Sequence, residues 1–586
     1  MKKIFLPLLL LCGLPYFLTA QSFTKVTTGS IVNTPSDSRS VNWIDFNNDG
    51  WQDLMITNGP QAGANNMLYK NNGDGTFTEI TGDPIVTDNK PSDGATWADH
   101  DNDGFIDCFV VNWYNVSNLF YTNNGNETFT YHDDLFQDGG FSETASWGDY
   151  DNDGLVDLYV TNSEGNKKNF MYHNDGGGVF TKILTGAIVN DAFYSRSINW
   201  IDYDNDNDQD VFVTNEEDQN ENLYTNDGEG NFTKITMGSL VNDGGKTMSS
   251  SWGDYDNDGD FDVFLANNLG YSSLFRNDGV DSFTKMTTDI VCNTYSQSFG
   301  SNWGDVNNDG YLDLYVTNSF GSGPHQNFLF MNNGDGSFTR NTTSPAVQEQ
   351  GWSYGCAFGD YDNDGFLDLA VANCYNASQS NSLFHNDGNS NNWLAIGCTG
   401  VVSNQAAIGT KVKIKVFING QPTWLLREIS AQSGYCGQNM LTVHFGIGTA
   451  TNVDTVRIEW PSGIVDIYED INVNQQIFAL EGQQITGTKE PVLPVLTTLS
   501  NYPNPFTDST SFEFELKKEA AIELAVFDLK GKKLAKISSG RYNSGIHNIA
   551  WNGELSNGQH IPPGVYVLTL IVNKEVLSKK LTCVGE

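Results

Sequence analysis

Short apolar segments separated by polar turns recur along residues 21–390. One kind contains tryptophan or tyrosine, as in Asn42–Phe46, and another is rich in β-branched residues, as in Asp53–Asn58. A third kind, such as Asn66–Asn71, is followed by a glycine-rich turn and a Phe-Thr pair at 77–78. Runs of five or six such residues bounded by Gly, Asn and Asp indicate β-strands. Each unit therefore predicts four short strands, the content of one propeller blade.

A nine-residue acidic loop lies between the first and second strand of every unit. Seven copies of this pattern, close to DxDxDGxxD, recur at intervals of about 50 residues. They begin at Asp45, Asp99, Asp149, Asp202, Asp254, Asp305 and Asp360. A period of this length indicates a solenoid, a propeller or an array of repeats.

The spacing of oxygen atoms in the loop predicts a calcium site. Side chains at positions 1, 3, 5 and 9 can surround one hard cation, with the backbone carbonyl of position 7 as a further ligand. The predicted side-chain ligands are Asp45, Asn47, Asp49 and Asp53; Asp99, Asp101, Asp103 and Asp107; Asp149, Asp151, Asp153 and Asp157; Asp202, Asp204, Asp206 and Asp210; Asp254, Asp256, Asp258 and Asp262; Asp305, Asn307, Asp309 and Asp313; and Asp360, Asp362, Asp364 and Asp368. The predicted carbonyl ligands belong to Trp51, Phe105, Leu155, Asp208, Asp260, Tyr311 and Phe366. We therefore expect about seven Ca²⁺ ions.

The loop does not fit an EF-hand or a plain polar turn. An EF-hand or dockerin loop needs a polar ligand at position 12 and flanking helices, but here position 12 is apolar and lies within a predicted strand: Ile56, Val110, Val160, Val213, Leu265, Val316 and Val371. A plain polar turn would leave several carboxylates repelling one another, seven times over. Position 6 is glycine except at Asn207, and asparagine also tolerates the left-handed backbone expected there.

The ends of the repeat region predict that the repeats close into a ring. The seventh unit stops at Ser382–Gly388 and lacks a Phe-Thr strand, while Ser22–Gly29 supplies such a strand before the first unit. Pairing of these two segments would complete the last blade and remove an open sheet edge. The predicted fold is therefore all-β, with a seven-bladed β-propeller over residues 21–390.

The recurring loop and Phe-Thr phrases resemble the FG-GAP/VCBS repeat family, whose calcium-looped blades also occur in integrin α-subunits. The resemblance covers about residues 22–390. It implies an extracellular binding or adhesion role.

Charge and the N-terminal segment indicate the compartment. The formal net charge of the 586 residues is −41, concentrated in the repeats, so nucleic acid is not an expected partner. Residues 1–20 read as a secretory signal peptide, and no other stretch is long and apolar enough to be a transmembrane segment. Cys398 with Cys436, and Cys356 with Cys374, are candidate disulfides in an extracellular protein.

Residues 391–482 predict a small β-domain. Its motifs resemble the ASPIC/UnbV domain, which follows such repeats in the cartilage acidic protein family and in many secreted bacterial proteins. The matching residues are Ile408-Gly409, Ser433-Gly434-Tyr435 with Gln438, His444-Phe445-Gly446 and Trp460-Pro461-Ser462-Gly463. The family has no agreed activity, so the resemblance implies none here.

Residues 483–496 read as a linker, and 497–586 as an Ig-like β-sandwich. The sandwich resembles the type A C-terminal sorting domain of the Bacteroidota type IX secretion system. The matching residues are Pro503-Asn504-Pro505-Phe506, Asp528 with Gly531-Lys532, Gly545 with His547, Trp551 and Gly564-Val565-Tyr566. The resemblance implies export across the outer membrane to the cell surface or medium, with the secretion machinery as a partner.

No catalytic motif is found in the sequence. His100 is interpreted as a loop spacer, His173 and His385 as surface variants, and His444 as a packed, hydrogen-bonded side chain.

Two functions remain open. One is a calcium-binding adhesion protein for an extracellular glycan or protein ligand. The other is a secreted lyase or hydrolase acting on polysaccharide through the propeller funnel, for which the nearest candidate acids are Glu216-Glu217-Asp218, more simply read as a solvated loop.

Overall fold

The computed structural model describes residues 22–279, 282–321, 325–374, 379–483, 496–516, 520–527, 532–555, 559–572 and 575–584. The predicted signal peptide and nearly all of the predicted linker lie outside these ranges. The chain divides into two compact units. The first runs to Gly487, apart from Asn48–Gly50, and the second begins at Thr488.

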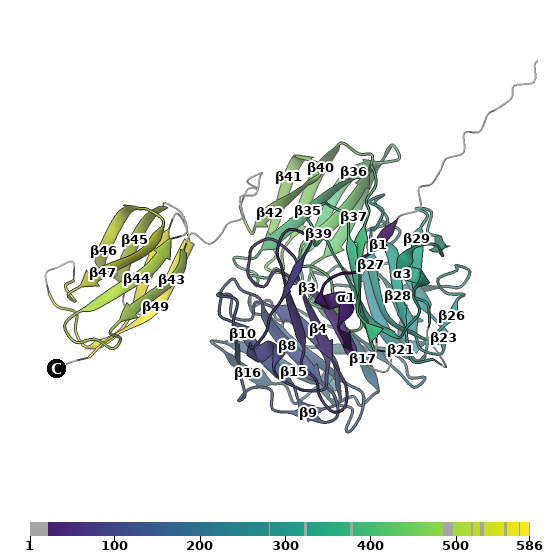
Figure 1. Ribbon diagram of the computed structural model, residues 1–586, viewed down its shortest axis with the longest axis horizontal. Helices are drawn as coiled ribbons and strands as arrows, with labels where there is room; N and C mark the ends of the chain where they lie inside the picture. The colour runs from purple at the N-terminus through teal and green to yellow at the C-terminus, as the bar shows by residue number, and fades with distance from the viewer. Residues whose placement is uncertain are drawn as a thin grey trace, which may run out of the picture. The chain divides into compact units, whose positions relative to one another are not determined.

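Seven antiparallel sheets, one for each acidic loop, form most of the first unit within the described residues (Figure 1). The first three are β3 (Ser38–Ile44), β4 (Asp53–Asn58), β5 (Met67–Asn71) and β6 (Phe77–Glu79); β7 (Ser92–Ala98), β8 (Asp107–Asn112), β10 (Leu119–Asn123) and β11 (Phe129–Tyr131); and β13 (Ser142–Gly148), β14 (Asp157–Asn162), β15 (Phe170–Gly176) and β16 (Val179–Lys182).

The next three sheets have the same strand order. They are β17 (Ser195–Ile201), β18 (Asp210–Asn215), β19 (Asn222–Thr225) and β20 (Thr233–Ile235); β21 (Thr247–Gly253), β22 (Asp262–Asn267), β24 (Ser273–Asn277) and β25 (Phe283–Met286); and β27 (Ser298–Gly304), β28 (Asp313–Asn318), β29 (Phe328–Asn332) and β30 (Phe338–Asn341).

The seventh sheet combines the two ends of the repeat region. It consists of β31 (Ser353–Gly359), β32 (Asp368–Asn373), β34 (Ser382–Asn386) and β1 (Phe23–Lys25). Phe23 pairs with Asn386 and Lys25 with Phe384, so the predicted pairing of the first Phe-Thr strand with the last repeat is confirmed. The first strands of successive sheets lie side by side in the order β3, β7, β13, β17, β21, β27 and β31, and β31 also contacts β3.

The connections carry only short elements. Two-stranded ribbons are formed by β2 (Pro35–Ser36) with β33 (Gln379–Ser380), β9 (Val116–Ser117) with β12 (Gly139–Gly140), and β23 (Gly270–Tyr271) with β26 (Tyr295–Ser296). The helical turns are α1 (Ser30–Asn33), η1 (Pro84–Val86), α2 (Ala187–Asn190), η2 (Leu240–Asn242) and α3 (Pro345–Gln348). Within the described part of the chain, no helix is both long and apolar enough to cross a membrane.

A recurring asparagine at the end of each third strand joins neighbouring sheets. Its side-chain N–H donates to a backbone carbonyl of the acidic loop in the preceding repeat, and its backbone N–H donates to the position-9 aspartate of its own loop. The side-chain bonds, 2.6–2.9 Å long, are Asn71 to Tyr361, Asn123 to Phe46, Asn174 to His100, Asn226 to Tyr150, Asn277 to Tyr203, Asn332 to Tyr255 and Asn386 to Val306. The bond from Asn71 links the first repeat to the seventh.

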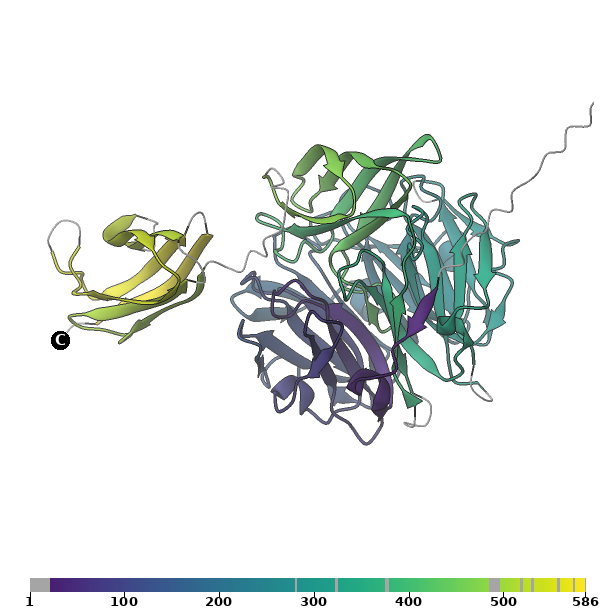
Figure 2. The ribbon, with the colours of Figure 1, turned by 45° about the horizontal axis from the view of Figure 1, so that its top comes forward.

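The second module, residues 391–483, packs on the repeats as part of the same unit (Figures 1 and 2). Its strands are β35 (Asn392–Thr399), β36 (Lys411–Ile418), β37 (Gln421–Glu428), β38 (Gly437–Gln438), β39 (Val443–Gly448), β40 (Asn452–Glu459), β41 (Val465–Asn472) and β42 (Gln475–Leu480). Seven of them form a β39-β35-β42 sheet and a β37-β36-β40-β41 sheet, while β38 pairs in parallel with β3 at the edge of the first repeat sheet. One hydrophobic core joins Phe445 and Val456 of this module to Trp147 and Val156 of the repeats.

Residues 429–440 of the second module, here called the central segment, lie inside the ring of first strands. The hydrogen bonds that attach it around the ring include Val41 N–H to the Cys436 carbonyl, Trp97 N–H to Gln438 Oε1, Tyr435 O–H to Glu143 Oε2, Asn199 Nδ2–H to the Gln432 carbonyl, and Phe358 N–H to Asn439 Oδ1. Tyr435 N–H also donates to Ser249 Oγ. The axis of the repeats, where the enzymatic alternative placed a funnel, is therefore occupied by the chain itself.

The seven cysteines that the structure describes are thiols rather than disulfides. Cys356, Cys374, Cys398 and Cys436 are free in the described residues, so both candidate disulfide pairs are wrong. Cys356 lies on β31 and Cys436 in the central segment, where each is buried by the ring of first strands.

The second unit is an all-β module with two sheets. Its strands are β43 (Leu496–Tyr502), β44 (Thr510–Leu516), β45 (Ala520–Phe527), β46 (Lys533–Tyr542), β47 (Gly545–Trp551), β48 (Gly564–Val572) and β49 (Glu575–Cys583). The β43-β44-β47 and β46-β45-β48-β49 sheets enclose one core that includes Phe512, Leu524 and Leu568.

Glu221 gives a pH-dependent test of the repeat structure. Five of the other six repeats place asparagine here, as at Asn66, which accepts from Asn58 N–H and donates to Ser92 Oγ. Glu221 accepts from Asn215 N–H at 2.6 Å and from Thr247 Oγ1 at 2.5 Å, and burial raises its pKa to about 8. Since the folded protein holds this proton more tightly than the unfolded chain, the carboxyl group lowers stability as pH rises from about 4.5 to about 8.

We expect Glu221→Gln to be near neutral at pH 5 and to stabilise the protein by about 1–3 kcal/mol at pH 8, because the amide keeps both hydrogen bonds without the buried charge. Melting temperatures of the variant and the parent at the two pH values measure this. An equal difference at both values would contradict it.

Asn226→Ala tests the bonds between sheets. It leaves the carbonyls of Tyr150 and Gln209 without their donor, so we expect a loss of about 2–4 kcal/mol in the free energy of unfolding. Asn231→Ala, on an exposed turn of the same repeat, is the matched control and should change stability by less than about 0.5 kcal/mol. Denaturant titration compares the two variants. Similar losses in the free energy of unfolding would show that the inter-sheet hydrogen bond contributes no more to stability than the exposed one.

Candidate functional site

The seven acidic loops share one backbone conformation. Position 4 is left-handed in every copy, with φ between 55° and 61°: Asn48, Asn102, Asn152, Asn205, Asn257, Asn308 and Asn363. Position 6 is also left-handed in every copy, and Asn207 adopts φ 76° where the other repeats have glycine. The expectation that asparagine would be accommodated there is confirmed.

Backbone N–H groups hold the carboxylates in place, as the third loop illustrates. Asp149 accepts from Asp153 N–H and Gly154 N–H, both at 3.1 Å, and Asp153 accepts from Leu155 N–H at 2.9 Å. Asp157 accepts from Tyr150 N–H at 3.3 Å and from Asn174 N–H at 2.8 Å. The same bonds fix positions 1, 5 and 9 in the second, fourth, fifth and seventh loops.

The first and sixth loops follow the same plan with one amide each. In the first loop Asp53 is buried and accepts from Phe46 N–H and Asn71 N–H. In the sixth loop Asn307 Oδ1 accepts from Asp309 N–H at 2.9 Å, and Asp305 and Asp313 take the positions of the other first and ninth aspartates. The structure therefore places the predicted ligands at equivalent points of seven similar loops.

In three loops the aromatic ring of position 7 packs on a neighbouring turn, so the residue offers only its backbone carbonyl as a metal ligand. Trp51, Phe105 and Tyr311 cover the glycine of the turn between the third and fourth strands. A Cβ built on Gly73, Gly125 or Gly334 would lie within 2.7–2.8 Å of the covering ring.

The carboxylates of one loop are close together and partly buried. In the second and third loops, oxygen atoms of positions 1, 3 and 5 lie within 4.8 Å of one another. Burial, followed by repulsion from Asp157 and Asp153, raises the pKa of Asp149 to about 8. Burial likewise raises the pKa of Asp305 to about 8 and that of Asp210 to about 9. A divalent cation would offset this repulsion, and an all-oxygen donor set suits Ca²⁺.

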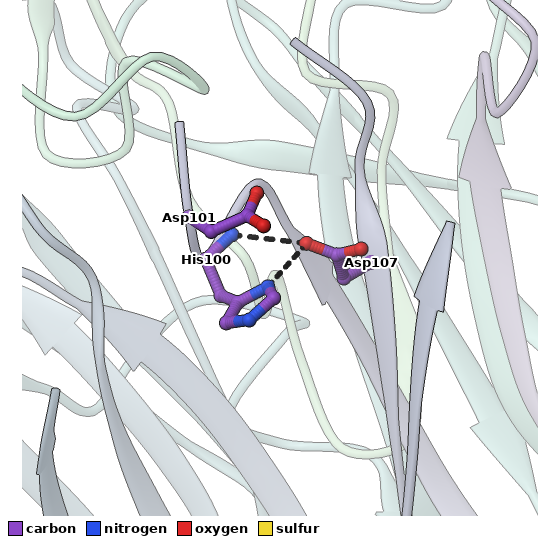
Figure 3. A group of neighbouring side chains, drawn as sticks. All are labelled: His100, Asp101 and Asp107. Carbon is purple, nitrogen blue, oxygen red and sulfur yellow. Dashed lines mark hydrogen bonds and ion pairs between the residues drawn. The ribbon is translucent and has the colours of Figure 1, made fainter. Parts of the chain in front are cut away.

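Three histidines contact the loops, which the sequence interpretation missed. His100 is buried rather than a spacer, and its Nδ1 lies 2.6 Å from Asp107 (Figure 3). His173 and His385, interpreted as surface variants, are partly exposed but lie 3.0 Å from Asp157 and 3.3 Å from Asp368. His173 and His385 recur at one position of the third strand, next to the recurring asparagine. That recurrence is the sequence signal that could have indicated their contact with the loops.

The second module covers the ends of the sheets that carry the acidic loops. Lys411 forms a buried ion pair with Asp202, and Gln405 N–H donates to Asn102 Oδ1 at 2.8 Å. Gly448 N–H donates to the Asn308 carbonyl at 2.7 Å. His444 Nε2–H donates to the Gly365 carbonyl at 3.0 Å, and burial lowers its pKa to about 4, so the prediction of a packed, hydrogen-bonded histidine is confirmed.

The opposite ends of the first strands carry a buried ionic cluster. Arg196 pairs with Glu143 and Glu216, and Tyr435 of the central segment donates to Glu143 at 2.5 Å. Glu216 was interpreted as part of a solvated loop. It is instead buried and ion-paired, because the neighbouring strand β17 places Arg196 beside it.

Comparison with known proteins identifies the repeats and the second module. The FG-GAP-like repeat family matches residues 45–110, 99–160, 149–213, 202–265, 254–316 and 318–371, which together exceed half of the chain. The ASPIC and UnbV family matches 400–486, and the FlgD Ig-like domain family matches 500–574. The fold and the acidic loops define an all-β repeat protein. The chain belongs to the FG-GAP-like repeat family.

Cartilage acidic protein 1 is a relative of part of the chain. The Xenopus tropicalis and Mus musculus proteins are each 27% identical to it over 265 residues, which cover 43% of this chain and 40% of those proteins. The chain therefore spans about two fifths of the length of these curated relatives.

Several solved structures are similar at a lower level. The six-bladed β-propeller lectin of Aleuria aurantia has a TM-score of 0.32 and 11% identity, covering 54% of this chain and 98% of the lectin. The intramolecular trans-sialidase of Ruminococcus gnavus has a TM-score of 0.35 and 10% identity, covering 62% and 97%. PorZ of Porphyromonas gingivalis has a TM-score of 0.31 and 10% identity, covering 96% and 73%. These values are too low to assign a function.

Two position-6 glycines provide a matched test of the loop and its cover. Both need a left-handed backbone, but a Cβ on Gly154 would lie 2.7 Å from the Val402 carbonyl of the second module, whereas one on Gly259 meets nothing within 4 Å. We expect Gly259→Ala to cost about 1–2 kcal/mol from backbone strain, and Gly154→Ala at least about 1 kcal/mol more. Equal losses in melting temperature would show that the Val402 carbonyl does not restrict the side chain at position 154.

Proposed function

We propose that this protein is a secreted or cell-surface calcium-binding β-propeller that binds an extracellular glycan or protein ligand. The seven sheets would form a closed seven-bladed propeller, with one Ca²⁺ in each acidic loop. The observation that carries the proposal is the sevenfold recurrence of one loop conformation, which in the second and third loops brings carboxylate oxygens of positions 1, 3 and 5 within 4.8 Å of one another.

The calcium would act as a structural element of each repeat. Asp149, Asp151, Asp153 and Asp157 would supply side-chain oxygens in the third loop, and Leu155 a carbonyl, with the corresponding residues in the others. Each ion would hold the first strand to the second at the end of the sheet that faces the second module. Because Asn174 bonds both Asp157 and the preceding loop, order in one loop would support order in its neighbour.

The face opposite the loops is the proposed ligand-binding face. The loop face is covered by the second module, whereas the opposite face carries exposed aromatic side chains. Tyr271 and Tyr295, each 59% exposed, face one another across the β23–β26 ribbon with ring centroids 5.6 Å apart. Exposed aromatic pairs are suited to stacking on sugar rings or protein side chains. The polysaccharide-cleaving alternative has no comparable support, since the central segment fills the axis.

Export is proposed from the sequence at the two ends of the chain. Residues 1–20 would direct the protein across the inner membrane. The C-terminal unit, which matches an Ig-like family, would act as a type IX sorting domain and be removed at the cell surface. Intact-mass measurement of the released protein tests this, and a product that retains Val584 would contradict it.

We expect calorimetric titration of the mature protein to reveal about seven Ca²⁺ sites. If each Kd is about 0.1–1 mM, 1 mM Ca²⁺ contributes about 0.4–1.4 kcal/mol per site by mass action. Chelation should therefore lower the melting temperature clearly, and Asp149→Ala should remove one site. Mg²⁺ should substitute poorly, because it requires a tighter octahedral shell. Two or fewer sites would refute the calcium proposal.

Ligand binding is tested on a glycan array and on immobilised extracellular matrix with the calcium-loaded protein. The Tyr271→Ala/Tyr295→Ala variant should lose most of the signal, while Tyr131→Ala, at an exposed tyrosine of the second sheet, should retain it. Release of sugar products during the assay would instead support the enzymatic function.

A further inference from the structure

A cavity of about 140 Å³ lies between the second module and sheets four to seven. Its walls come from β21, β27, β37, β39 and the central segment. On the other side of the module, over sheets two and three, the same interface is filled by an apolar core. The cavity is therefore a local departure from close packing rather than a general looseness of the interface.

Six residues that line this cavity each carry a buried polar atom without a hydrogen-bond partner among the described residues. These atoms are Trp252 Nε1, Asn302 Oδ1, Arg427 Nη2, Glu428 Oε2, Gln432 Oε1 and His444 Nδ1. Folded proteins rarely leave one such atom unsatisfied, so six around a single cavity indicate a polar occupant.

The donors in the cavity point to an anion. Arg427 Nη1 donates to the Leu426 carbonyl, but Nη2 has no partner, and no carboxylate among the described residues forms an ion pair with the guanidinium. The carboxylates that act on it through space, Asp254 and Asp305, are held by N–H groups of their own loops. An unpaired buried guanidinium is costly, and water alone compensates it poorly. Trp252 supplies a second N–H donor.

The acceptors in the cavity point to an adjacent donor group on the same ligand. Asn302 Nδ2–H already donates to the Cys356 carbonyl and Gln432 Nε2–H to the Gly434 carbonyl, so their free atoms are oxygen acceptors. His444 uses its Nε2–H on a carbonyl, which leaves Nδ1 of the neutral ring as a lone-pair acceptor. A hydroxyl or ammonium group would satisfy these atoms.

We propose that this cavity binds a small carboxylate that bears a hydroxyl or amino group on the neighbouring carbon. Arg427 and Trp252 would bind the carboxylate, and the free acceptor atoms of Asn302, Gln432, His444 and Glu428 would face the donor group. The volume suits a molecule of about six heavy atoms, since a cavity of about 150 Å³ accepts benzene. The cavity borders the fifth and sixth acidic loops, from which Phe261 and Asp305 line it, so binding is tested on calcium-loaded protein. It lies apart from the proposed ligand face and does not depend on that face.

The test uses the calcium-loaded full-length mature protein and four probes of similar size: L-lactate, L-alanine, propionate and isobutyramide. Trp200, Trp252 and Trp303 line the cavity, so binding is followed by tryptophan fluorescence and confirmed by calorimetry. We expect saturable binding of lactate or alanine with a Kd of about 1 mM or lower. Propionate, which lacks the donor group, should bind at least about tenfold more weakly, and uncharged isobutyramide should not bind. Comparison of lactate with alanine shows whether the donor is a hydroxyl or an ammonium group.

Variants locate the site. Arg427→Met should weaken binding at least tenfold, and Trp252→Phe, which keeps an aromatic ring but removes the N–H, about threefold to tenfold. Arg457→Met, at a more exposed arginine on β40 of the same module, is the matched control and should bind as the parent does. If Arg427→Met does not fold, Trp252→Phe alone decides. No saturation by any probe, equal binding of propionate, or unchanged binding by Trp252→Phe would each overturn the proposal and leave the cavity filled by water only.

Discussion

The double role of one asparagine in each repeat is the constraint on which the first unit depends. Its backbone N–H fixes the ninth residue of its own acidic loop, and its side chain bonds a carbonyl of the preceding loop. No sheet could rotate or shift alone without breaking a buried hydrogen bond on each side. The loops are therefore ordered by their neighbours as well as by their own sequence, and the bond from Asn71 to the Tyr361 carbonyl applies the same restraint between the first and seventh repeats.

This arrangement explains how strongly acidic loops can be part of a folded core. Aspartates such as Asp157 and Asp313 are buried at the junction of two strands, where each accepts two backbone N–H groups. Those bonds favour the ionised carboxylate, whereas burial and neighbouring carboxylates oppose it and raise the pKa. The loops thus combine fixed geometry with unbalanced charge, which is the condition under which a bound cation contributes to stability.

Much of the local structure could be predicted because it repeats. The alternation of short apolar segments defined the strands, and the displaced Phe-Thr segment at the N-terminus defined its pairing with Ser382–Asn386. The candidate loop residues followed from spacing alone. Glycine or asparagine at position 6 made the left-handed backbone there predictable as well, since few other residues adopt positive φ readily.

Features that occur only once in the chain could not be predicted from repetition. The path of the central segment depends on contacts between Tyr435 and residues nearly 300 positions earlier, and nothing in the local sequence SAQSGYCGQ specifies them. Glu216 looked like part of a solvated loop because its partner, Arg196, is on another strand. His100 occupies a position that is aromatic in five of the other six repeats, and its burial next to Asp107 follows from that position, not from its polarity.

The position of the central segment also constrains the order of assembly. Residues 429–440 follow all seven sheets in the chain, and β1 pairs with a strand more than 350 residues away. The ring therefore cannot be completed while the chain is still growing from its N-terminus through the sixth repeat. Either the sheets gather around the segment, or it enters between first strands that are already in contact, from the side of the acidic loops. In both cases the final native contacts form only after synthesis of the second module, so the chain reaches its stable form late and as a whole.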